Sequence, residues 1–404
     1  MAKKVNLPEP IIPNDSWKVV KLGQYVKILN GYPFDSSRFT NSNENTYPLI
    51  RIRDVVRGYT ETFTDEDCPD EYKIKKGEIL IGMDGDFNIS RWKSDFGLLN
   101  QRVCKISTVS KDLDEKFLFY YLPIPLKLIN DATPSVTVKH LSSTSLQELH
   151  FPLPTLAEQQ RIVNRIESMF TKLDEAKEKA QNVVDSFETR KAAILHKAFT
   201  GKLTAKWRAE NGISDDSWEE KRFDEIAEIK SNLVDVADYQ NFPHIAPDNI
   251  EKKTGVLLEY HTVAEDKVTS GKHRFYAGQI LYSKIRPYLS KVVIVDFDGV
   301  CSADMYPIEA KDDTRFLWYQ MLSNEFLDKA SNAGSRSVLP KINQKELSII
   351  DMRICSLPEQ QEIVRILDNV LEKERTAKES AEKVVEQIDL LKKSILARAF
   401  RGEL

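Results

Sequence analysis

The chain has 404 residues, of which 41% are hydrophobic and 30% are charged, and its formal net charge is −4 at pH 7. This composition excludes a disordered or collagen-like chain, and the length predicts two or three domains at roughly 150 residues each. There is no run of 18 apolar residues and no apolar leader after Met1. We therefore expect a cytoplasmic location, without a membrane span or a secretory signal.

Net charge and cysteine spacing also limit the classes of function. A chain that coats nucleic acid without selectivity is usually basic, so DNA contacts here must be local or shared with partners. The four cysteines lie far apart and have no zinc-ligand spacing, which is typical of a reducing compartment.

Alternating strand-like and helical segments predict two mixed α/β modules, each followed by a long helix. Residues 47–52 and 78–81 read as strands, and residues 114–130 read as a helix. Residues 291–295 and 312–330 give a strand and a helix further along. The predicted segments are a tail (1–14), a first module (15–154), a helix (155–200), a polar linker (201–214), a second module (215–355) and a last helix (356–404).

The chain is an internal repeat. Residues 155–203 align with residues 356–404 at a constant offset of 201, without a gap, and 20 of 49 positions are identical. Average residue usage would give about three matches by chance. The same offset matches Asp15-Ser16-Trp17 with Asp216-Ser217-Trp218. We therefore expect two copies of one unit, whose globular parts have diverged more than their helices.

Apolar residues recur in the two helices at the alternating four- and three-residue spacing of a coiled coil, interrupted at Arg190 and at Glu374. Thr155 and Ser356 open predicted capping boxes, and Gly201 and Gly402 stand where helices end. The expected core residues are Ile162, Ile166, Met169, Leu173, Val183, Phe187 and Ile194 in the first helix, and Ile363, Leu367, Val370, Val384, Ile388, Leu391 and Ile395 in the second.

A tandem repeat within one chain predicts a pseudo-two-fold arrangement, as in an isologous dimer. A two-fold axis across the helix pair makes the helices antiparallel. The expected fold class is α+β, with two globular α/β modules separated by two long helices packed as an antiparallel coiled coil.

The motifs of the common catalytic classes are missing from the sequence. There is no GxxxxGK[ST] loop, no HExxH spacing and no Gly-rich methyltransferase turn. Residues 69–73 and 247–253 mimic the carboxylate and lysine pattern of a nuclease, but the groups lie too close together along the chain. We expect these two stretches to be polar turns, and we assign neither a catalytic site nor a metal site.

The repeat layout resembles the specificity subunit of type I restriction-modification enzymes. The resemblance rests on the two helices that begin Leu-x-Glu-Gln-Gln at Leu156 and Leu357 and end Ala-Phe-x-Gly-x-Leu at Leu203 and Leu404, with the linker that starts at Gly201. It implies that the modules are target recognition domains, each of which reads one half of a split, asymmetric site in double-stranded DNA. The helices would set the spacer and dock two modification subunits.

The same resemblance assigns the chemistry to partner subunits. The modification (methyltransferase) subunits would use S-adenosylmethionine, and the restriction (motor-nuclease) subunits would use ATP with Mg²⁺. The chain itself would be non-catalytic and would bind no cofactor. The Glu-Gln-Gln segments at the helix starts either contact partner subunits or serve only for capping and solvation.

Candidate DNA contacts are polar and cationic side chains in loops that match between the modules. Residues 83–93 and 282–288 follow the shared Gly-x-Ile-Leu strand as loops, and residues 133–140 and 334–341 resemble phosphate-gripping turns. Arg51 and Arg53 share a strand face and either point at DNA or pair with acids such as Asp54. Asn100-Gln101-Arg102 is a weaker candidate. The predicted contacts are Arg51, Arg53, Asn88, Ser90, Arg91, Lys93, Thr133, Ser135, Thr137 and Lys139 in the first module, and Ser283, Lys284, Arg286, Tyr288, Ser335, Arg336, Ser337 and Lys341 in the second.

Two other classes of function remain open from the sequence. One is a coiled-coil scaffold with two protein-binding modules and no direct DNA role. The other is an enzyme that acts alone, such as a nuclease, which would cleave DNA with Mg²⁺ in the absence of partners.

Overall fold

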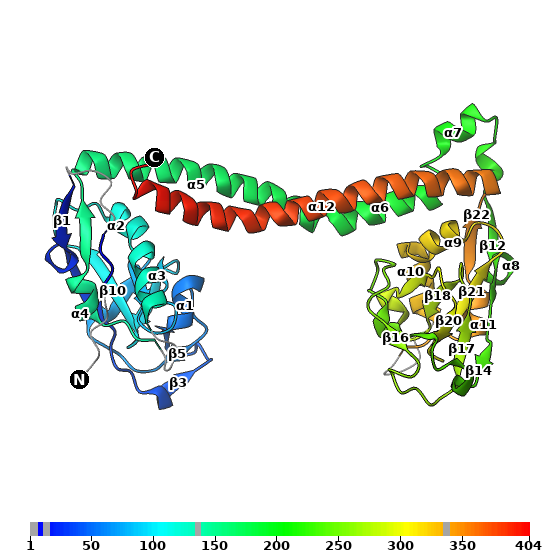
Figure 1. Ribbon diagram of the computed structural model, residues 1–404, viewed down its shortest axis with the longest axis horizontal. Helices are drawn as coiled ribbons and strands as arrows, with labels where there is room; N and C mark the ends of the chain where they lie inside the picture. The colour runs from blue at the N-terminus through cyan, green and yellow to red at the C-terminus, as the bar shows by residue number, and fades with distance from the viewer. Residues whose placement is uncertain (1–6, 11–16, 134–138, 334–339) are drawn as a thin grey trace. The chain divides into compact units, whose positions relative to one another are not determined.

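The computed structural model describes residues 7–10, 17–133, 139–333 and 340–404. It contains two compact units, each of which combines one globular module with part of both long helices (Figure 1). Unit 1 contains the described residues up to Lys179 together with Lys383–Leu404, and unit 2 contains Ala180–Glu382. Among the described residues, no helix is long and apolar enough to cross a membrane.

Two sheets and a strand pair form the globular module of unit 1. The strand orders are β2-β10-β7-β8, β3-β5-β4-β9-β6 and β1-β11. All neighbours are antiparallel except β4 and β9, which are parallel. The strands are β1 Lys18–Lys21, β2 Val26–Asn30, β3 Phe39–Thr40, β4 Tyr47–Ile50, β5 Phe63–Thr64, β6 Lys73–Lys75, β7 Ile79–Gly82, β8 Ile89–Arg91, β9 Phe96–Leu99, β10 Val103–Thr108 and β11 His150–Leu153. The helices are η1 Leu22–Gln24, η2 Ser36–Arg38, α1 Ile52–Arg57, η3 Asp70–Tyr72, α2 Glu115–Tyr121, α3 Pro123–Ala132 and α4 Ser143–Glu148.

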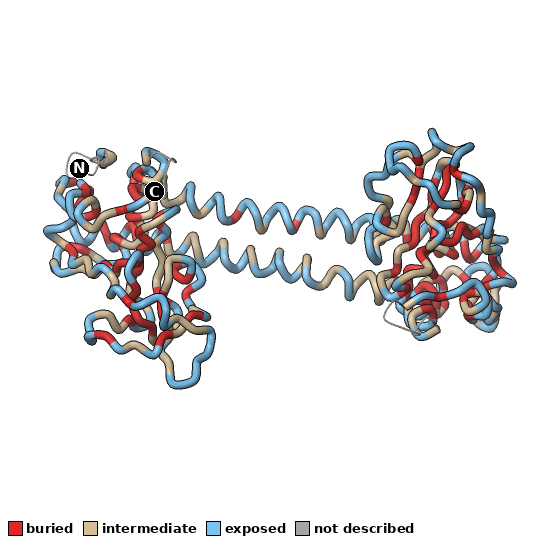
Figure 2. The backbone as a smooth tube through the Cα atoms, turned by 90° about the horizontal axis from the view of Figure 1, so that it is seen from below, coloured by how far each residue is buried: buried red, intermediate tan, exposed pale blue. Residues whose placement is uncertain are grey.

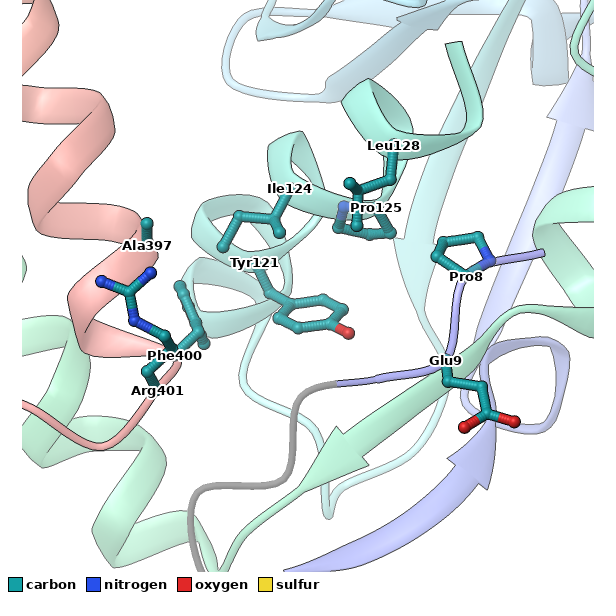
Figure 3. A pocket seen from close by; sticks show the side chains of 9 residues that line it. All are labelled: Pro8, Glu9, Tyr121, Ile124, Pro125, Leu128, Ala397, Phe400 and Arg401. Carbon is teal, nitrogen blue, oxygen red and sulfur yellow. The ribbon is translucent and has the colours of Figure 1, made fainter. Parts of the chain in front are cut away.

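The main core of unit 1 lies between its first sheet, helices α2 and α3, and one end of each long helix. The Phe117 and Tyr121 rings pack edge-on against Phe400, with centroids 5.3 Å and 5.2 Å away. Beside Tyr121 and Phe400 is a small cavity of about 50 Å³, which Pro8 and Glu9 also line (Figure 3). The aromatic cluster therefore attaches the last turn of the second long helix to this module.

The module of unit 2 repeats this plan. Its sheets have the orders β13-β21-β18-β19 and β14-β17-β20-β15-β16, with the pair β12-β22. The strands are β12 Glu219–Arg222, β13 Ala227–Ile229, β14 Leu233–Val234, β15 Pro243–Ile245, β16 His261–Thr262, β17 Lys272–Phe275, β18 Ile280–Ser283, β19 Val292–Ile294, β20 Gly299–Cys301, β21 Met305–Ala310 and β22 Asp351–Ile354. The helices are η4 Asp215–Ser217, α8 Phe223–Ile226, η5 Val236–Tyr239, η6 Pro247–Asn249, η7 Pro287–Leu289, α9 Thr314–Met321, α10 Asn324–Ala333 and α11 Gln344–Ser348.

One edge of the five-stranded sheet differs between the modules. Strands β5, β4, β9 and β6 correspond in order to β16, β15, β20 and β17. The additional strand β3 pairs with β5, whereas β14 pairs with β17 at the opposite edge. The core of unit 2 otherwise matches that of unit 1, because Phe199 packs edge-on against Phe316 at 5.4 Å.

The long helices are α5 Leu156–Asp185 with α6 Phe187–Phe199, and α12 Leu357–Ala399. In unit 1, Lys177 pairs with Asp389 at 2.8 Å and Asp174 pairs with Lys392. Residue numbers rise along one helix as they fall along the other. The predicted antiparallel packing is therefore correct within this unit.

The two interruptions of the apolar pattern meet in unit 2. Arg190 Nε donates to Glu374 Oε2 at 2.7 Å, and the side chains are 34% and 25% exposed. The same guanidinium donates to the Ser186 hydroxyl and to the Val183 carbonyl at 3.2 Å, where α5 gives way to α6. The polar residues that break the pattern therefore form one half-buried cluster in the contact between the two long helices, which we call the seam.

Most residues of the helix pair beyond the module cores are exposed or only partly buried (Figure 2). Ile162, Ile166, Ile363, Leu367 and Ile388 are buried, as predicted for the coiled-coil core. The prediction is wrong for Val384 and Leu391, which are 40% and 49% exposed. The polar seam residues Glu374, Lys378 and Lys392 are partly buried, so part of the contact is polar rather than apolar. The remaining predicted core residues, Met169, Leu173, Val183, Phe187, Ile194, Val370 and Ile395, are partly buried.

The Glu-Gln-Gln segments fasten the helices to the modules. Gln159 is fully buried; its amide oxygen accepts from Asp114 N–H at 2.8 Å and its nitrogen donates to the Asp112 and Pro154 carbonyls. Gln360 makes the equivalent bonds to Asp313 N–H and the Cys355 carbonyl. The central glutamine of each segment is therefore neither solvated nor exposed to a partner, so both expectations are wrong for it.

The predicted capping boxes form only in part, because their glutamates have other partners. Thr155 accepts from Glu158 N–H at 3.4 Å, but the Glu158 carboxylate binds Arg161. The Glu359 carboxylate is fully buried and accepts from Thr204, Arg208 and Trp218. Helix α7, Ala205–Glu210, carries Arg208, so the linker predicted as polar contains a helix that packs on α12.

Candidate nucleic-acid interface

Two predicted loop segments meet at the same place in each module. The turn after β7 forms a backbone bridge between Asp84 and His140, and the turn after β18 forms one between Ile285 and Lys341. Gly85 N–H donates to the Lys139 carbonyl at 3.0 Å, and Arg286 N–H donates to the Pro340 carbonyl at 2.8 Å. The offset of 201 therefore relates backbone hydrogen bonds as well as residues, and it defines one turn that both modules present.

In the first module this turn borders an open hollow of about 530 Å³. Four separate segments line it, namely η2 with β3, the start of α1, the turn after β7 and the residues that follow β9. The lining residues are Ser36, Phe39, Arg51, Ile52, Arg53, Val56, Asp84, Gly85, Asp86, Asn88, Asn100, Gln101 and Arg102. Guanidinium and amide groups, which suit guanine and adenine edges respectively, therefore converge on one concave surface.

Asn100 lies at a buried position in this hollow. The residue is 7% exposed, and its side-chain oxygen has no hydrogen-bond partner among the described residues. A buried amide oxygen without a partner costs about 1–3 kcal/mol. Asn100 therefore leaves one buried acceptor unsatisfied in the wall of the hollow.

Asp84 organises the cations at the rim of the same hollow. Its carboxylate is 15% exposed and contacts His140 Nδ1 at 2.6 Å and Arg102 at 3.5 Å. Asp84 therefore joins three chain segments, so that the positions of Arg102 and His140 depend on one acid. The sequence analysis did not single out Asp84, although it stands at the start of a predicted reading loop.

A second, more open hollow of about 780 Å³ adjoins the first through Arg53. Its lining is mostly polar and includes two asparagines and a second arginine that the sequence analysis did not select. The lining residues are Asn41, Asn43, Arg53, Arg57, Thr60, Glu61 and Phe63. Arg57 and Glu61 are 3.9 Å apart, so part of this charge is already paired.

Arg51 and Arg53 do line the first hollow, but the strand predicted for them is wrong. Strand β4 ends at Ile50 and α1 begins at Ile52. The Asp54 carboxylate accepts from Arg51 N–H at 3.0 Å, which satisfies a free donor at the start of the helix. Arg53 lies 3.8 Å from Asp54 and donates to Thr62 at 2.9 Å. Local capping therefore overrides the strand-like sequence.

The candidate reading loop over residues 83–93 is in part a hairpin. Residues Ile89–Arg91 form β8, which pairs with β7 as a hairpin. Arg91 binds Glu115 at 2.7 Å and lies over the Phe119 ring, and Lys93 N–H donates to the Gly58 carbonyl. Asn88 alone of the four predicted residues lines the hollow, whereas Ser90, Arg91 and Lys93 do not.

The second predicted segment of the first module supports the turn from behind. Lys139 Nζ donates to the Asn130 carbonyl at 2.7 Å, and the Thr133 hydroxyl donates to the Ile129 carbonyl. These bonds hold the end of α3 next to the turn. Ser135, Thr137, Ser335, Arg336 and Ser337 lie outside the described residues.

In the second module an acid again organises the cations, from a different position. Lys341 pairs with Asp304 at 3.2 Å, and Lys284 Nζ donates to the Ala303 carbonyl. Asp304 directly precedes β21, and Arg102 directly precedes the equivalent strand β10. The position that holds a cation in the first module therefore holds an acid in the second. Ser283 is 1% exposed and donates to the Ile285 carbonyl, so its prediction as a DNA contact is wrong.

Arg286 and Tyr288 are the exposed side chains of this turn; Tyr288 is 47% exposed. Arg286 has a φ of 48°, in the left-handed region that costs a non-glycine residue roughly 1–2 kcal/mol. The matching residue of the first module is Gly85, with a φ of 75°. Both turns therefore have a left-handed residue at this position, but only the second module has a side chain there.

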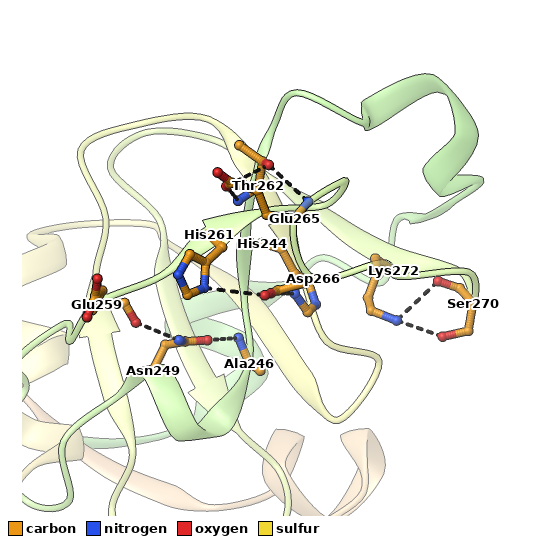
Figure 4. A network of polar contacts seen from close by, with 10 residues as sticks. All are labelled: His244, Ala246, Asn249, Glu259, His261, Thr262, Glu265, Asp266, Ser270 and Lys272. Carbon is orange, nitrogen blue, oxygen red and sulfur yellow. Dashed lines mark hydrogen bonds and ion pairs between the residues drawn. The ribbon is translucent and has the colours of Figure 1, made fainter.

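A polar network in the second module joins strands rather than forming a metal site. Asp266 accepts from His244 at 2.7 Å and lies 3.4 Å from His261, while Asn249 bridges Ala246 and Glu259 (Figure 4). Over the described ranges, no group of three or more histidine, cysteine or acidic residues could hold a metal ion. The nuclease-like stretches form the 3-10 turns η3 and η6, as expected of polar turns.

Comparison with known proteins identifies the repeat. The family described as type I restriction modification DNA specificity domain matches residues 14–185 and again residues 215–387. The chain belongs to this family. It carries two copies of the DNA specificity domain, one in each unit, and DNA recognition is the function of the two modules.

Full-length relatives and a solved structure agree with this assignment. The specificity subunit of the type I restriction enzyme EcoDI from Escherichia coli is 35% identical over 96% of this chain and 88% of the relative. The EcoBI specificity subunit from the same species is 30% identical over 97% and 87%. The HsdS subunit from Thermoanaerobacter tengcongensis has the same fold, with a TM-score of 0.62 at 16% identity, over 96% of this chain and 98% of that one.

Proposed function

We propose that this chain is the DNA-recognition subunit of a type I restriction-modification complex and is itself non-catalytic. Each specificity domain reads one half of a split, asymmetric DNA site. The observation that carries this proposal is the pair of matching turns, joined by bridges at positions 84 and 140 and at 285 and 341, which present different side chains on one backbone frame. Domains with different side chains at equivalent positions suit unequal half-sites.

The helix pair sets the spacer between the half-sites and docks two modification subunits. Its apolar and ionic contacts hold each helix end in the core of a module, as Phe400 and Phe199 do. The modification subunits use S-adenosylmethionine, and the restriction subunits use ATP with Mg²⁺. The motifs for these reactions are missing from this chain, which agrees with such a division of labour.

Partners also supply part of the affinity for DNA. Residues 15–150 contain 18 Lys and Arg against 19 Asp and Glu. Non-specific affinity depends on the number of phosphates that cations neutralise, so this domain provides little by itself. The isolated chain is expected to bind DNA weakly, with a strong dependence on salt, and to gain affinity when the complex assembles.

Domain exchange tests the proposal. Residues 15–154 are replaced by the equivalent domain of another family member, and the methylated motif is determined by long-read sequencing in a host that carries the complete system. One half-site should change while the other half-site and the spacer stay the same. Replacement of residues 215–355 is the matched control, and it should change only the other half-site. A motif that survives both exchanges supports the scaffold function instead.

A paired insertion tests the spacer. Four residues added after Ala180 and four after the matching Ala381 lengthen each helix by about 6 Å. The recognised motif should keep both half-sites and gain spacer length. Changed half-sites with an unchanged spacer would contradict the proposed role of the helices.

A further inference from the structure

The turn after β18 holds an arginine in a backbone conformation that normally favours glycine. Arg286 has a φ of 48°, and the matching residue of the first domain is Gly85, with a φ of 75°. Both residues donate their N–H to the other loop, to the Pro340 and Lys139 carbonyls respectively. Glycine can adopt the backbone conformation of this turn, as Gly85 does, so the backbone does not require an arginine.

Backbone hydrogen bonds hold the turn at both of its ends. Ser290, at the far end of the turn, is also left-handed, with a φ of 45°, and is 2% exposed. Lys253 N–H lies 3.2 Å from the Leu289 and Ser290 carbonyls, and Lys191 of helix α6 donates to the Lys253 carbonyl at 2.7 Å. Lys253 N–H therefore holds the far end of the turn, and the bond from Arg286 N–H to the Pro340 carbonyl holds its near end. Strained residues persist where the surrounding structure fixes the backbone in this way.

The Arg286 side chain is exposed and makes no hydrogen bond or ion pair with the described residues. Its cationic neighbours are engaged, because Lys341 pairs with Asp304 and Lys284 donates to the Ala303 carbonyl. Pro287 restricts the backbone directly after the arginine, and Tyr288 is exposed beside it. Within the described part of the chain, the guanidinium therefore projects from a turn held at both ends and has no partner for its donors.

We propose that Arg286 is a specificity-determining residue of the second domain and that it reads a guanine in the second half-site. The inference rests on the proposed function, since it requires that this turn faces DNA. A guanidinium fork matches the O6 and N7 acceptors of guanine in the major groove, which is the commonest specific contact of arginine with DNA. A strained position retains an arginine because its side chain is needed there, while the first domain, with glycine, reads its half-site from other residues.

The test compares Arg286→Gly with the matched control Lys267→Gly. Lys267 is an exposed cation of the same domain with a φ of 51°, so both substitutions remove one charge and relieve one left-handed residue. The assembled complex is used to measure the methylated motif in the host and the binding preference for the intact site over sites with one base pair changed. Thermal unfolding of the chain is recorded in parallel.

Arg286→Gly should lose roughly 5- to 150-fold in discrimination at a single guanine position of the second half-site, with the melting temperature unchanged or raised. The first half-site and the spacer should stay the same. Lys267→Gly should leave the motif unchanged. Arg286→Lys should also lose the discrimination, because an ammonium lacks the planar fork.

Three results would overturn the inference. A loss of affinity in Arg286→Gly that is uniform across DNA sequences, with discrimination retained, would mean a phosphate contact rather than base reading. A lower melting temperature in Arg286→Gly would mean a structural role. An unchanged motif in Arg286→Gly, when exchange of residues 215–355 does change the half-site, would refute the inference and leave the proposed function standing. If that exchange also has no effect, the proposed function fails as well.

Discussion

The two specificity domains differ most where the β-sheet frame ends and the loops begin. Strand pairing in the first sheet, the aromatic attachment to the helices and the bridge between the two loops are the same in both domains. In contrast, the first domain has helix α1 with Arg51 and Arg53 where the second has the turn η6, and the acid of the rim moves from Asp84 to Asp304. A shared frame with exchanged charges allows one fold to present two different surfaces to DNA.

A second difference concerns how the helices are attached. Glu359 is fully buried beneath the linker helix, where it binds Arg208 at 2.6 Å, whereas the matching Glu158 is partly exposed and pairs with Arg161. The same motif residue therefore has a buried ion pair in unit 2 and a surface ion pair in unit 1. Sequence identity between the helix copies does not imply equal energetic roles.

The largest expected effect is the loss of that buried pair. Glu359→Ala takes the carboxylate away from the buried Arg208 guanidinium and should lower the free energy of unfolding by about 3 kcal/mol or more. Glu158→Ala is the matched control and should cost about 1 kcal/mol or less, since its partner is exposed. Equal losses in the two variants would contradict the difference between the units.

Alkylation of the buried cysteines can show which unit unfolds first in these variants. Cys68 and Cys104 are in unit 1, and Cys301 and Cys355 are in unit 2, and all four are buried free thiols. Burial raises the pKa of Cys104 to about 12, so at pH 8 almost no thiolate is present while the chain is folded. Alkylation in rising urea, followed by mass spectrometry, should label Cys301 and Cys355 first in Glu359→Ala.

The next largest effect concerns the hollow of the first domain. Asn100→Ala removes a buried amide from the wall of the hollow and should reduce discrimination at one base pair of the first half-site by about 1–3 kcal/mol. Arg91→Ala is the control, because Arg91 lies on β8 and already binds Glu115. The methylated motif of a complex that carries Arg91→Ala should be unchanged. A changed motif in Arg91→Ala alone would place the reading surface on the hairpin instead of in the hollow.

A smaller effect concerns the seam of the helix pair. The charged pair Arg190 and Glu374 matches Leu391 and Leu173 at the offset of 201, so unit 1 has leucines at the equivalent positions. Glu374→Leu alone should destabilise the chain by about 1 kcal/mol, since it leaves Arg190 half-buried without its carboxylate. The double variant Arg190→Leu with Glu374→Leu should recover this loss, which urea unfolding measures. A double variant that remains less stable than the unmodified chain would show that the ion pair contributes net stability.

Periodicity and self-similarity were enough to predict the repeat, the antiparallel direction of the helices within a unit, and five buried residues of the helix pair. They depend on short-range spacing and on an offset that the chain itself contains. The strand placed at Arg51 was wrong because one carboxylate, Asp54, starts a helix there. The four- and three-residue spacing of the second helix predicted Val384 in the core, but polar side chains take part in the actual contact.

The candidate interface was predictable only as a set of segments. Spacing from the shared Gly-x-Ile-Leu motif located the two turns, and composition suggested their neighbours. That three of these segments line one hollow together with η2 and β3 depends on strand order, which the sequence alone did not reveal. Left-handed backbone at Arg286 was likewise hidden, because only the alignment with Gly85 hints at it, and that alignment needs the structure to show its meaning.

The smallest expected effect separates phosphate contacts from base contacts in the two domains. Arg53 borders both hollows and is half-exposed, and Lys341 pairs with Asp304 at the rim of the second domain. If each contacts a phosphate, Arg53→Ala and Lys341→Ala should each reduce the slope of log affinity against log salt by about 0.9. The fall in affinity should be uniform across DNA sequences, with the methylated motif unchanged. Salt titrations of the assembled complex with specific and random duplexes measure both quantities. A motif that relaxes in Arg53→Ala would move this residue from phosphate contact to base reading, and the first domain would then use a guanidinium as the second uses Arg286.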